Sequence, residues 1–210
     1  DADDGLGSGA TATDNALVFQ ETCSPEDAFD YSACTVFPDF QDIRQSGTEI
    51  LRNTDDSNET LTDTLLGDFT FSFYGTSYNS LNVNTNGLLT FGGNPGSAAN
   101  NTNLTTSPSP ATIAAFWTDL HTDSVADEVY WEVQGTGDNQ QLVIQWNDVV
   151  FDDGDSDSVD DRGNGVTFQV ILSEQDDSIQ VNHLDLHGGA NVDGNEGALA
   201  TVGIKDSGNQ

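Results

Sequence analysis

Positively charged side chains are scarce in this 210-residue sequence, where four Lys and Arg residues face 36 Asp and Glu residues, for a formal net charge of −32. The four bases, scattered singly, are Arg44, Arg52, Arg162 and Lys205. Nucleic acids and anionic membranes are bound through clustered Lys and Arg, so both are excluded as simple partners. Repulsion among the acids weakens in molar salt, where the screening length falls to ~3 Å. We therefore expect a halophilic protein of high-salt surroundings.

Long apolar runs, methionine and all but two cysteines are also missing. No run approaches the ~20 apolar residues of a membrane-spanning helix, so we expect no membrane span in the printed residues. The sequence begins with Asp1 and contains no Met, which we interpret as a secreted product without its signal peptide. Cys23 and Cys34 lie close in sequence, and in an exported protein such a pair is expected to form a disulfide. Free thiols or metal ligation are less favoured alternatives, because no other Cys or His lies near them in the sequence.

Apolar residues are nonetheless spread along the chain at 35%, which suffices for a core and argues against a disordered acidic tail. Their dominant period is two, which predicts strands with one buried and one wet face; Asn82 and Asn84 are expected on a wet face. Asn86-Gly87 predicts a hairpin, because both residues accept positive φ. About nine strands at hairpin spacing predict an all-β, antiparallel β-sandwich or jelly-roll-like fold. The expected strands lie within 69–74, 81–85, 88–91, 113–117, 129–133, 142–146, 166–172, 179–183 and 198–204.

A single helical turn is expected at Ser24-Pro25-Glu26-Asp27, where serine can cap a turn that begins with proline. We divide the chain into an N-terminal extension (1–21), a disulfide loop with this turn (22–47) and a β-sandwich domain (48–210). Three Asn-X-Thr sequons lie in polar stretches that we interpret as surface loops, and their asparagines are candidate glycosylation sites. These asparagines are Asn58, Asn100 and Asn103.

The densest acidic stretch follows one of the predicted strands. In it Asp153, Asp155 and Asp157 alternate, a pattern that can direct oxygens towards a calcium ion. It is not an EF-hand, since Ser158 replaces the turn glycine and Asn164 stands in place of the last glutamate. A solvated halophilic loop is the alternative interpretation, and it is the one that a chain this acidic favours. No cofactor is expected to be required.

Catalytic patterns are few, because the sequence has no nucleophile elbow, zinc-protease motif or phosphate loop. His183 and His187 fall at the end of a predicted strand, where positions four apart lie ~13 Å from each other. We expect two ordinary exposed or half-buried histidines, and a surface metal site with Asp185 is the less favoured alternative. Asp119 and Asp123 fit paired carboxylates for glycoside chemistry, but acids are so abundant that proximity carries little information. Three tryptophans fit a sugar platform less well than core packing, since they alternate within strands. They are Trp117, Trp131 and Trp146.

Seven sequence blocks follow one another between residues 48 and 205. They are Phe69-Thr-Phe-Ser-Phe-Tyr-Gly75, Val83-Asn-Thr-Asn-Gly-Leu-Leu-Thr-Phe-Gly92, Ile113-Ala-Ala-Phe-Trp-Thr-Asp119, Val129-Tyr-Trp131, Val143-Ile-Gln-Trp-Asn147, Thr167-Phe-Gln-Val-Ile-Leu172 and Ala200-Thr-Val-Gly-Ile204. In this order they resemble the nidogen-like extracellular domain of adhesive, matrix and secreted microbial surface proteins. The resemblance implies a non-enzymatic extracellular β module, and it carries over no catalytic residue.

The resemblance also implies a departure at the end of the chain. Nidogen-like modules continue past the strand that matches 200–204 to a further short apolar strand, whereas the printed sequence ends at Gln210, so we expect a sheet one strand short. An isolated apolar strand lies at 15–20, after a flexible Gly- and Ser-containing stretch. Its assembly residues are Ala16, Leu17, Val18 and Phe19.

We expect this segment to complete the sandwich of a neighbouring copy, so that subunits join head to tail in a cell-surface filament or pilus. One alternative is that it completes its own sandwich, which leaves a monomeric module that binds a surface glycan or protein. A secreted hydrolase is the third hypothesis.

Overall fold

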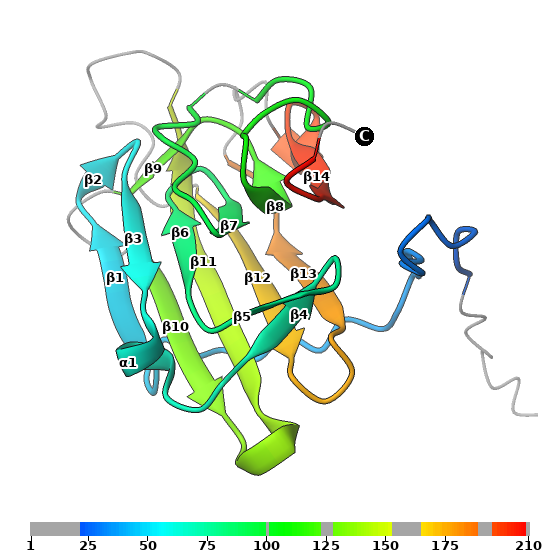
Figure 1. Ribbon diagram of the computed structural model, residues 1–210. Coiled ribbons are helices and arrows are strands. Elements are labelled where there is room, and N and C mark those ends of the chain that lie inside the picture. Colours follow the sequence, from blue (N-terminus) through cyan, green and yellow to red (C-terminus); the bar gives the residue numbers. More distant parts are fainter. Residues whose placement is uncertain (1–21, 100, 123–127, 153–164, 189–194, 209–210) are drawn as a thin grey trace, which may run out of the picture. The chain divides into compact units, whose positions relative to one another are not determined.

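The computed structural model describes residues 22–99, 101–122, 128–152, 165–188 and 195–208 (Figure 1). The chain divides into two units, Asp1–Phe37 and Pro38–Gln210, and each is described by itself. Among the described residues, no helix is long and apolar enough to cross a membrane.

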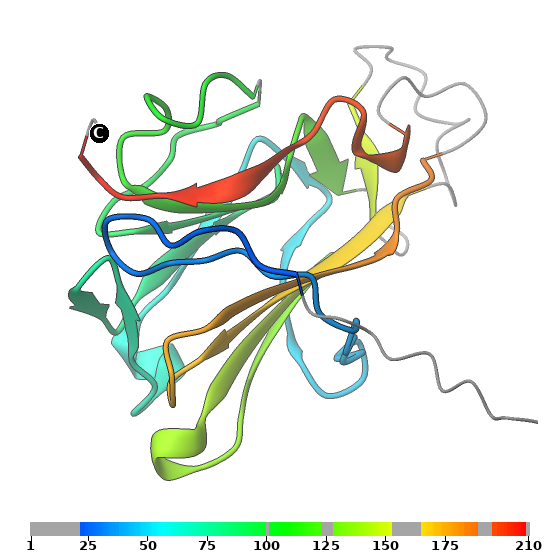
Figure 2. The ribbon, with the colours of Figure 1, turned by 90° about the vertical axis from the view of Figure 1, so that its right-hand side faces the viewer.

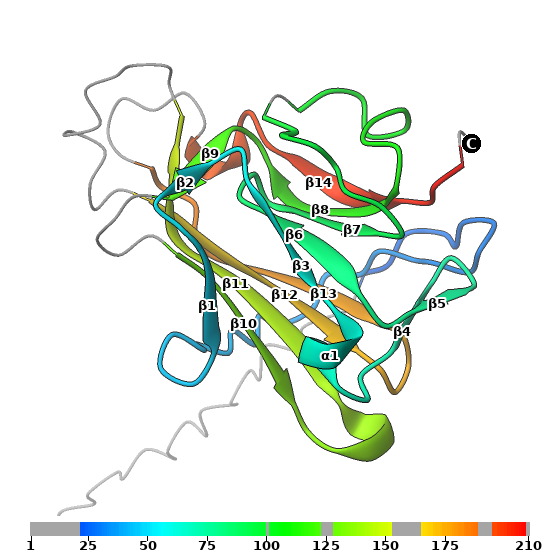
Figure 3. The same ribbon diagram turned by 60° about the vertical axis from the view of Figure 1, so that its left-hand side comes forward.

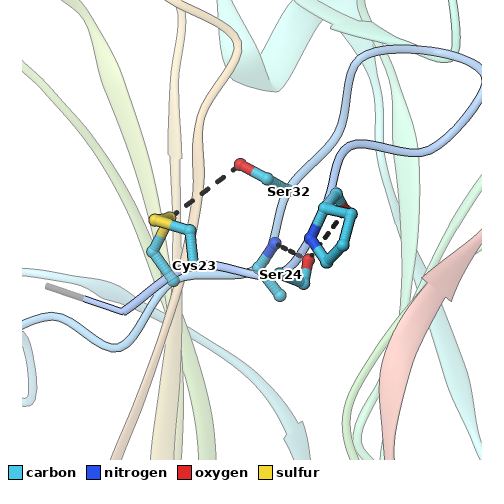
Figure 4. Close-up of a disulfide and its surroundings, with 6 residues drawn as sticks. Cys23, Ser24 and Ser32 are labelled. Carbon is cyan, nitrogen blue, oxygen red and sulfur yellow. Dashed lines mark hydrogen bonds between the residues drawn. A yellow bond between two sulfur atoms is a disulfide. The ribbon is translucent and has the colours of Figure 1, made fainter.

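In the first unit, Cys23 and Cys34 form the disulfide that the sequence predicts, and they also pair as an isolated antiparallel bridge. Figure 4 shows Ser24 and Ser32 beside this bond. Ser24 Oγ accepts a hydrogen bond from Ala33 N at 3.0 Å, and Ser32 Oγ lies 3.9 Å from Cys34 Sγ. Backbone and side-chain hydrogen bonds therefore close the loop together with the disulfide.

The helical turn predicted at Ser24–Asp27 is not formed. Asp27 Oδ1 instead accepts hydrogen bonds from the N–H groups of Phe29 (2.8 Å) and Tyr31 (3.0 Å). An aspartate that bonds to the backbone ahead of it favours a non-helical turn, because its side chain competes with the helical ladder. The serine meant to cap the helix is engaged with Ala33 across the loop.

The second unit contains an antiparallel sheet of seven strands. Its main path runs β1 (Thr48–Arg52), β10 (Glu128–Gln134), β11 (Gln141–Phe151), β12 (Val166–Ser173) and β13 (Ile179–Asp185), while β9 (Leu120–Thr122) pairs with both β11 and β2 (Thr54–Asp55). The predicted hairpins 129–146 and 166–183 are confirmed as β10–β11 and β12–β13.

A five-stranded antiparallel sheet faces the first one (Figure 3). Its order is β14 (Thr201–Lys205), β8 (Ala111–Trp117), β7 (Leu88–Phe91), β6 (Leu81–Asn84) and β3 (Asn58–Leu61); β4 (Phe71–Phe73) and β5 (Thr76–Tyr78) form a separate hairpin. The helices are short, namely α1 (Asp63–Leu66) and the 3-10 turns η1 (Gly137–Asn139) and η2 (Asn195–Gly197). The described residues hold fourteen strands rather than about nine, because short strands such as β2 and β9 give no readable alternation.

The core lies between the two larger sheets. Phe116 of β8 contacts Phe168 of β12, with ring centroids 5.4 Å apart, and Phe168 stacks on Trp146 of β11 at 4.8 Å. The indole N–H of Trp146 donates to Asn84 O of β6 at 3.0 Å, again from one sheet to the other. Trp117 and Trp131 are buried as well, so the prediction that all three tryptophans pack inside the protein is confirmed. The fold is an all-β antiparallel sandwich, as the sequence predicts.

Loops cover the outer face of each sheet. Leu88, Ala114 and Trp117 pack with Leu104 on the outside of the five-stranded sheet, and Ile43 packs on Val143 on the outside of the other. Strands that are covered on both faces bury every residue, as β6, β7 and β8 do. The expected alternation between a buried and a wet face therefore does not hold for these strands.

Asn82 and Asn84, predicted to face water, are buried for this reason. Asn82 Nδ2 donates to Gly93 O at 2.8 Å and Asn84 Nδ2 to Ser97 O at 3.1 Å, so the loop after β7 satisfies both amides. A buried amide side chain also holds the segment before β1, since Gln145 Oε1 accepts a hydrogen bond from Ile43 N at 2.9 Å. Amide side chains suit these positions because each both donates and accepts.

The hairpin predicted at Asn86-Gly87 is formed between β6 and β7. Of the two residues, only Gly87 has positive φ (+77°). Asn86 is instead held by its side chain, since its Oδ1 accepts from Leu120 N at 2.6 Å and its Nδ2 donates to Asp56 at 2.9 Å. Tertiary hydrogen bonds thus override the local turn preference.

Candidate functional site

The strands β13 and β14 are the end strands of the two larger sheets, and they border the same side of the sandwich (Figure 2). In the described part of the second unit, β13 pairs only with β12 and β14 only with β8. His183 Nε2 of β13 lies 3.0 Å from Ala115 O of β8, which joins the two sheets next to this border. We call this border, from β13 to β14, the open side.

The other two end strands, β1 and β3, contact each other on the opposite side of the sandwich. Edge strands with free pairing capacity are a template for another strand, and β13 and β14 are strands of this kind.

Three exposed apolar side chains lie on or beside the two strands of the open side. Leu184 of β13 is 63% exposed, Val202 of β14 is 55% exposed and Leu199, just before β14, is 56% exposed. Among the described residues of the second unit, the other exposed large apolar side chain is Leu65 of α1. Leucine and valine on adjacent free edges suit the addition of an apolar strand.

The chain enters the second unit next to the open side. Asp39 N donates to Asn182 Oδ1 of β13 at 3.4 Å, and Asn182 Nδ2 returns a bond to Asp39 O at 3.0 Å. From there the backbone crosses the sheet, with Gln41 bonded to Gln169 of β12 in both directions. The N-terminal residues therefore leave the sandwich at β13.

A second feature is a cluster of three carboxylates at one end of the sandwich. Asp55 of β2, Asp56 beside it and Asp119 before β9 each offer an oxygen, and these oxygens all lie within 4.8 Å of one another. The chain is held here by Asp152 N, which donates to Asp119 O at 3.1 Å, and by the bond from Asn86 to Asp56. We call Asp55, Asp56 and Asp119 the acidic cluster.

Burial and nearby negative charges disfavour the charged forms of Asp119 and Asp55. Burial, followed by the charges of Asp152, Asp56 and Asp55, raises the pKa of Asp119 to about 6. Burial first, and then the charge of Asp56, also raises the pKa of Asp55. Chemically, convergent carboxylate oxygens suit a hard cation, and a carboxyl group with a pKa near 6 suits proton transfer. Structural clusters shift pKa values in the same way.

Several residues predicted as sites lie outside the described residues. These are the calcium candidates Asp153, Asp155 and Asp157, the glycoside candidate Asp123, the sequon residue Asn100 and the assembly residues Ala16, Leu17, Val18 and Phe19. The calcium site stays a prediction. Its first residue, Asp153, follows Asp152 in the sequence, and the backbone N–H of Asp152 donates to Asp119 O of the acidic cluster. Sequence reasoning singled out Asp119 but not Asp55 or Asp56. In a chain with 36 acidic residues, nothing in the sequence distinguishes these two from the others.

The histidines do not form a metal centre in the described part of the chain. His183 contacts the rings of Phe116 and Phe168 at the sheet border, and His187 is exposed. The described groups of three or more metal-ligating side chains do not include either residue.

Comparison with known proteins gives one family. A family model described as "NIDO related" matches residues 30–210. Neither the curated proteins nor the solved structures gave a match. The matched range includes the whole second unit, and together with the Cys23–Cys34 disulfide it indicates an extracellular β domain. Such domains are not typically enzymes. This chain belongs to the NIDO-related family.

Proposed function

We propose that this protein is a non-enzymatic subunit of an extracellular filament, in which residues 15–20 of one copy add as a strand to the open side of the next. The observation that carries the proposal is the open side itself, which is formed by two end strands with three exposed apolar side chains on or beside them. Strand addition satisfies backbone groups at a sheet edge, and alternate side chains of the added strand supply specificity. Leu17 and Phe19 are the alternate apolar residues of the segment.

The Cys23–Cys34 disulfide favours a neighbour over the strand's own sandwich. The two Cα atoms are 4.0 Å apart, so the residues between them add nothing to the reach of the chain. The covalent path from Pro38 to Gln20 then spans at most about 28 Å, compared with about 60 Å without the bridge. The shorter connection restricts the positions that residues 15–20 can take along their own open side, and a restricted connection favours the exchange of elements between copies.

The contact so formed is heterologous, because the N-terminal segment of one copy meets the open side of another. A heterologous contact that does not close into a ring produces a filament. The same segment bound to its own open side would instead give a monomeric surface module. The buried tryptophans remove the sugar platform that would have favoured a carbohydrate-binding module.

The test is the mass of the assembly, measured by size-exclusion chromatography with light scattering in molar salt, and its form in negative-stain microscopy. The donor variant is Leu17→Asp with Phe19→Asp, and the acceptor variant is Val202→Asp on β14. Leu65→Asp is the matched control, because Leu65, like Val202, is an exposed apolar residue but lies on α1. We expect filaments from the wild type and the control, and monomers from each of the other two variants.

Mixing the donor and acceptor variants gives the sharpest result. The acceptor variant still carries a normal strand and the donor variant a normal open side, so one contact can form between them. We expect a discrete dimer, since each partner blocks further growth. A chain that lacks residues 1–21 and still assembles to the wild-type size would contradict the proposal, as would a wild type that is monomeric.

A further inference from the structure

Two of the three Asn-X-Thr sequons lie in described residues, and the structure places them differently. Asn103 lies in the loop between β7 and β8 and is exposed, as is Thr105 of the same sequon. Asn58 begins β3 and is half-buried. Attachment of a glycan requires the asparagine amide nitrogen, so the surroundings of this atom separate the two sites.

The sequon at Asn103 forms a tight turn around its own side chain. Asn103 Oδ1 accepts hydrogen bonds from Thr105 N at 3.0 Å and from Thr105 Oγ1 at 2.8 Å. Both bonds go to the oxygen, and in the described residues no hydrogen bond engages the Asn103 amide nitrogen. When the Asn103 amide nitrogen loses a proton, negative charge develops on Oδ1, and the two hydrogen bonds from Thr105 stabilise that charge. This geometry therefore favours reaction at the amide nitrogen.

Neighbouring residues hold this turn in place. Leu104 packs on the cluster of Leu88, Ala114 and Trp117, so the residue between Asn103 and Thr105 points into the fold. On the other flank, Asn101 Nδ2 donates to the backbone oxygens of Trp117 and Leu199. The acceptor asparagine is thus presented on an anchored, outward-facing turn.

The sequon at Asn58 is tied up within the sheet. Asn58 Nδ2 donates to Gly96 O at 2.7 Å, and its Oδ1 accepts from Asn84 Nδ2 at 2.9 Å. The hydroxyl of Thr60 donates to Asn82 Oδ1 at 2.8 Å rather than to Asn58. Extended pairing of β3 with β6 keeps Asn58 and Thr60 in this arrangement. Modification at Asn58 would therefore have to take place at an amide nitrogen that is already engaged with Gly96 O.

We propose that Asn103 is a glycosylation site of the folded protein and that Asn58 is not. The co-reactant is an oligosaccharide linked to a polyprenyl phosphate carrier. In the reaction, a bond forms between the Asn103 amide nitrogen and C1 of the first sugar, the bond from C1 to the phosphate oxygen breaks, and the carrier phosphate leaves with the electron pair. The amide proton is transferred to a base of the transferase, and no oxidant or reductant is needed.

The experiment incubates the purified full-length chain, folded in the salt it requires, with a lipid-linked oligosaccharide and an oligosaccharyltransferase active in that salt. Intact-mass spectrometry counts the glycans, and peptide mapping locates them. Synthetic peptides spanning each sequon act as controls that the enzyme accepts both sequences. The variants are Asn103→Gln, Thr105→Ala, Thr105→Ser and the matched control Asn58→Gln.

We expect both peptides to be modified, whereas the folded chain is modified at Asn103 at least about tenfold faster than at Asn58, since each hydrogen bond to be broken slows the reaction. Asn103→Gln and Thr105→Ala should lose this glycan, Thr105→Ser should keep it, and Asn58→Gln should leave the mass gain unchanged. Modification at Asn58 at a comparable rate would overturn the proposal. So would an unmodified Asn103 in a chain whose peptide is accepted, including the case in which only Asn100 carries a glycan.

Discussion

Asp119 shows how single carboxyl groups are treated in this highly charged molecule. Most acids can turn their charge towards water, but Asp119 is half-buried, and it shares the acidic cluster with Asp55 and Asp56. Among the described salt bridges, the partners of the arginines are Asp42, Glu49 and Glu128, none of which belongs to the cluster. The acidic cluster therefore carries repulsion that described arginine pairs do not relieve.

This repulsion predicts a pH dependence of stability. The pKa of Asp119 is raised in the folded protein to about 6 from an ordinary value of 3.8, mainly by burial, so the folded state holds its proton more tightly than the unfolded state. Its contribution to stability is therefore fully present below pH 3.8 and is lost as the pH rises towards 6. We expect Asp119→Asn to raise the melting temperature at pH 7 and to flatten the curve between these two values.

The measurement is thermal unfolding across this pH range at fixed salt for the wild type, Asp119→Asn and Asp68→Asn, an exposed acid outside the cluster. The difference between the first two curves isolates Asp119 from the many other acids. A curve for Asp119→Asn that is parallel to the wild type throughout would show that repulsion in the cluster does not affect folding.

At the scale of elements, the β6–β7 hairpin depends on one glycine. Gly87 has a φ of +77°, and a Cβ atom placed there would lie 2.4 Å from Phe116 O of β8. Gly96 has the same φ but no atom within 4 Å of an added Cβ. Backbone strain alone costs about 1 kcal/mol, whereas strain with a backbone clash is expected to cost about 3 kcal/mol or more.

Gly87→Ala and Gly96→Ala therefore form a matched pair. We expect the free energy of unfolding to fall in Gly96→Ala by the cost of backbone strain alone. In Gly87→Ala it should fall clearly further, because β8 cannot move away without opening the core. Denaturant unfolding with a common slope measures both values. Equal losses would mean that the hairpin relaxes around the new methyl group.

The disulfide is expected to control assembly through the length of the connection. In Cys23→Ser with Cys34→Ser, the reach from Pro38 to Gln20 grows to about 60 Å, which makes it easier for segment 15–20 to bind its own open side. We expect the fraction of monomer to rise several-fold in light scattering at equal protein concentration. Oxidised and reduced wild-type protein supply the control, since they differ in the same bond without a substitution. An unchanged monomer fraction would show that the length of the connection does not control assembly.

At the scale of the whole molecule, the net charge of −32 opposes compactness in dilute buffer. Raising the salt from 0.1 to 2 M shortens the screening length severalfold, and relief of a few kcal/mol of repulsion corresponds to a rise in melting temperature of ~10 °C. Thermal unfolding in sodium chloride measures this rise. Sucrose at equal water activity is the control, because it acts on burial but does not screen charge. A similar rise in both solutes would assign the effect to the solvent and not to charge.

The sequence alone determined the fold class, the disulfide and the burial of the tryptophans. These features depend on local pattern: a period of two predicts strands, and two nearby cysteines in an exported chain predict a bond. The hairpins at 129–146 and 166–183 were readable for the same reason, since their strands are long and their turns are short.

Tertiary structure alone decided what covers each face and which distant residues meet. Asn82 and Asn84 are buried because a loop from 93 to 98 folds over them, and no local pattern encodes that contact. Asp55 and Asp119 are far apart in sequence and meet only because β2 pairs with β9. The open side likewise exists only once β13 and β14 become the ends of two sheets, because an edge is a property of strand order, and strand order is set by long-range pairing.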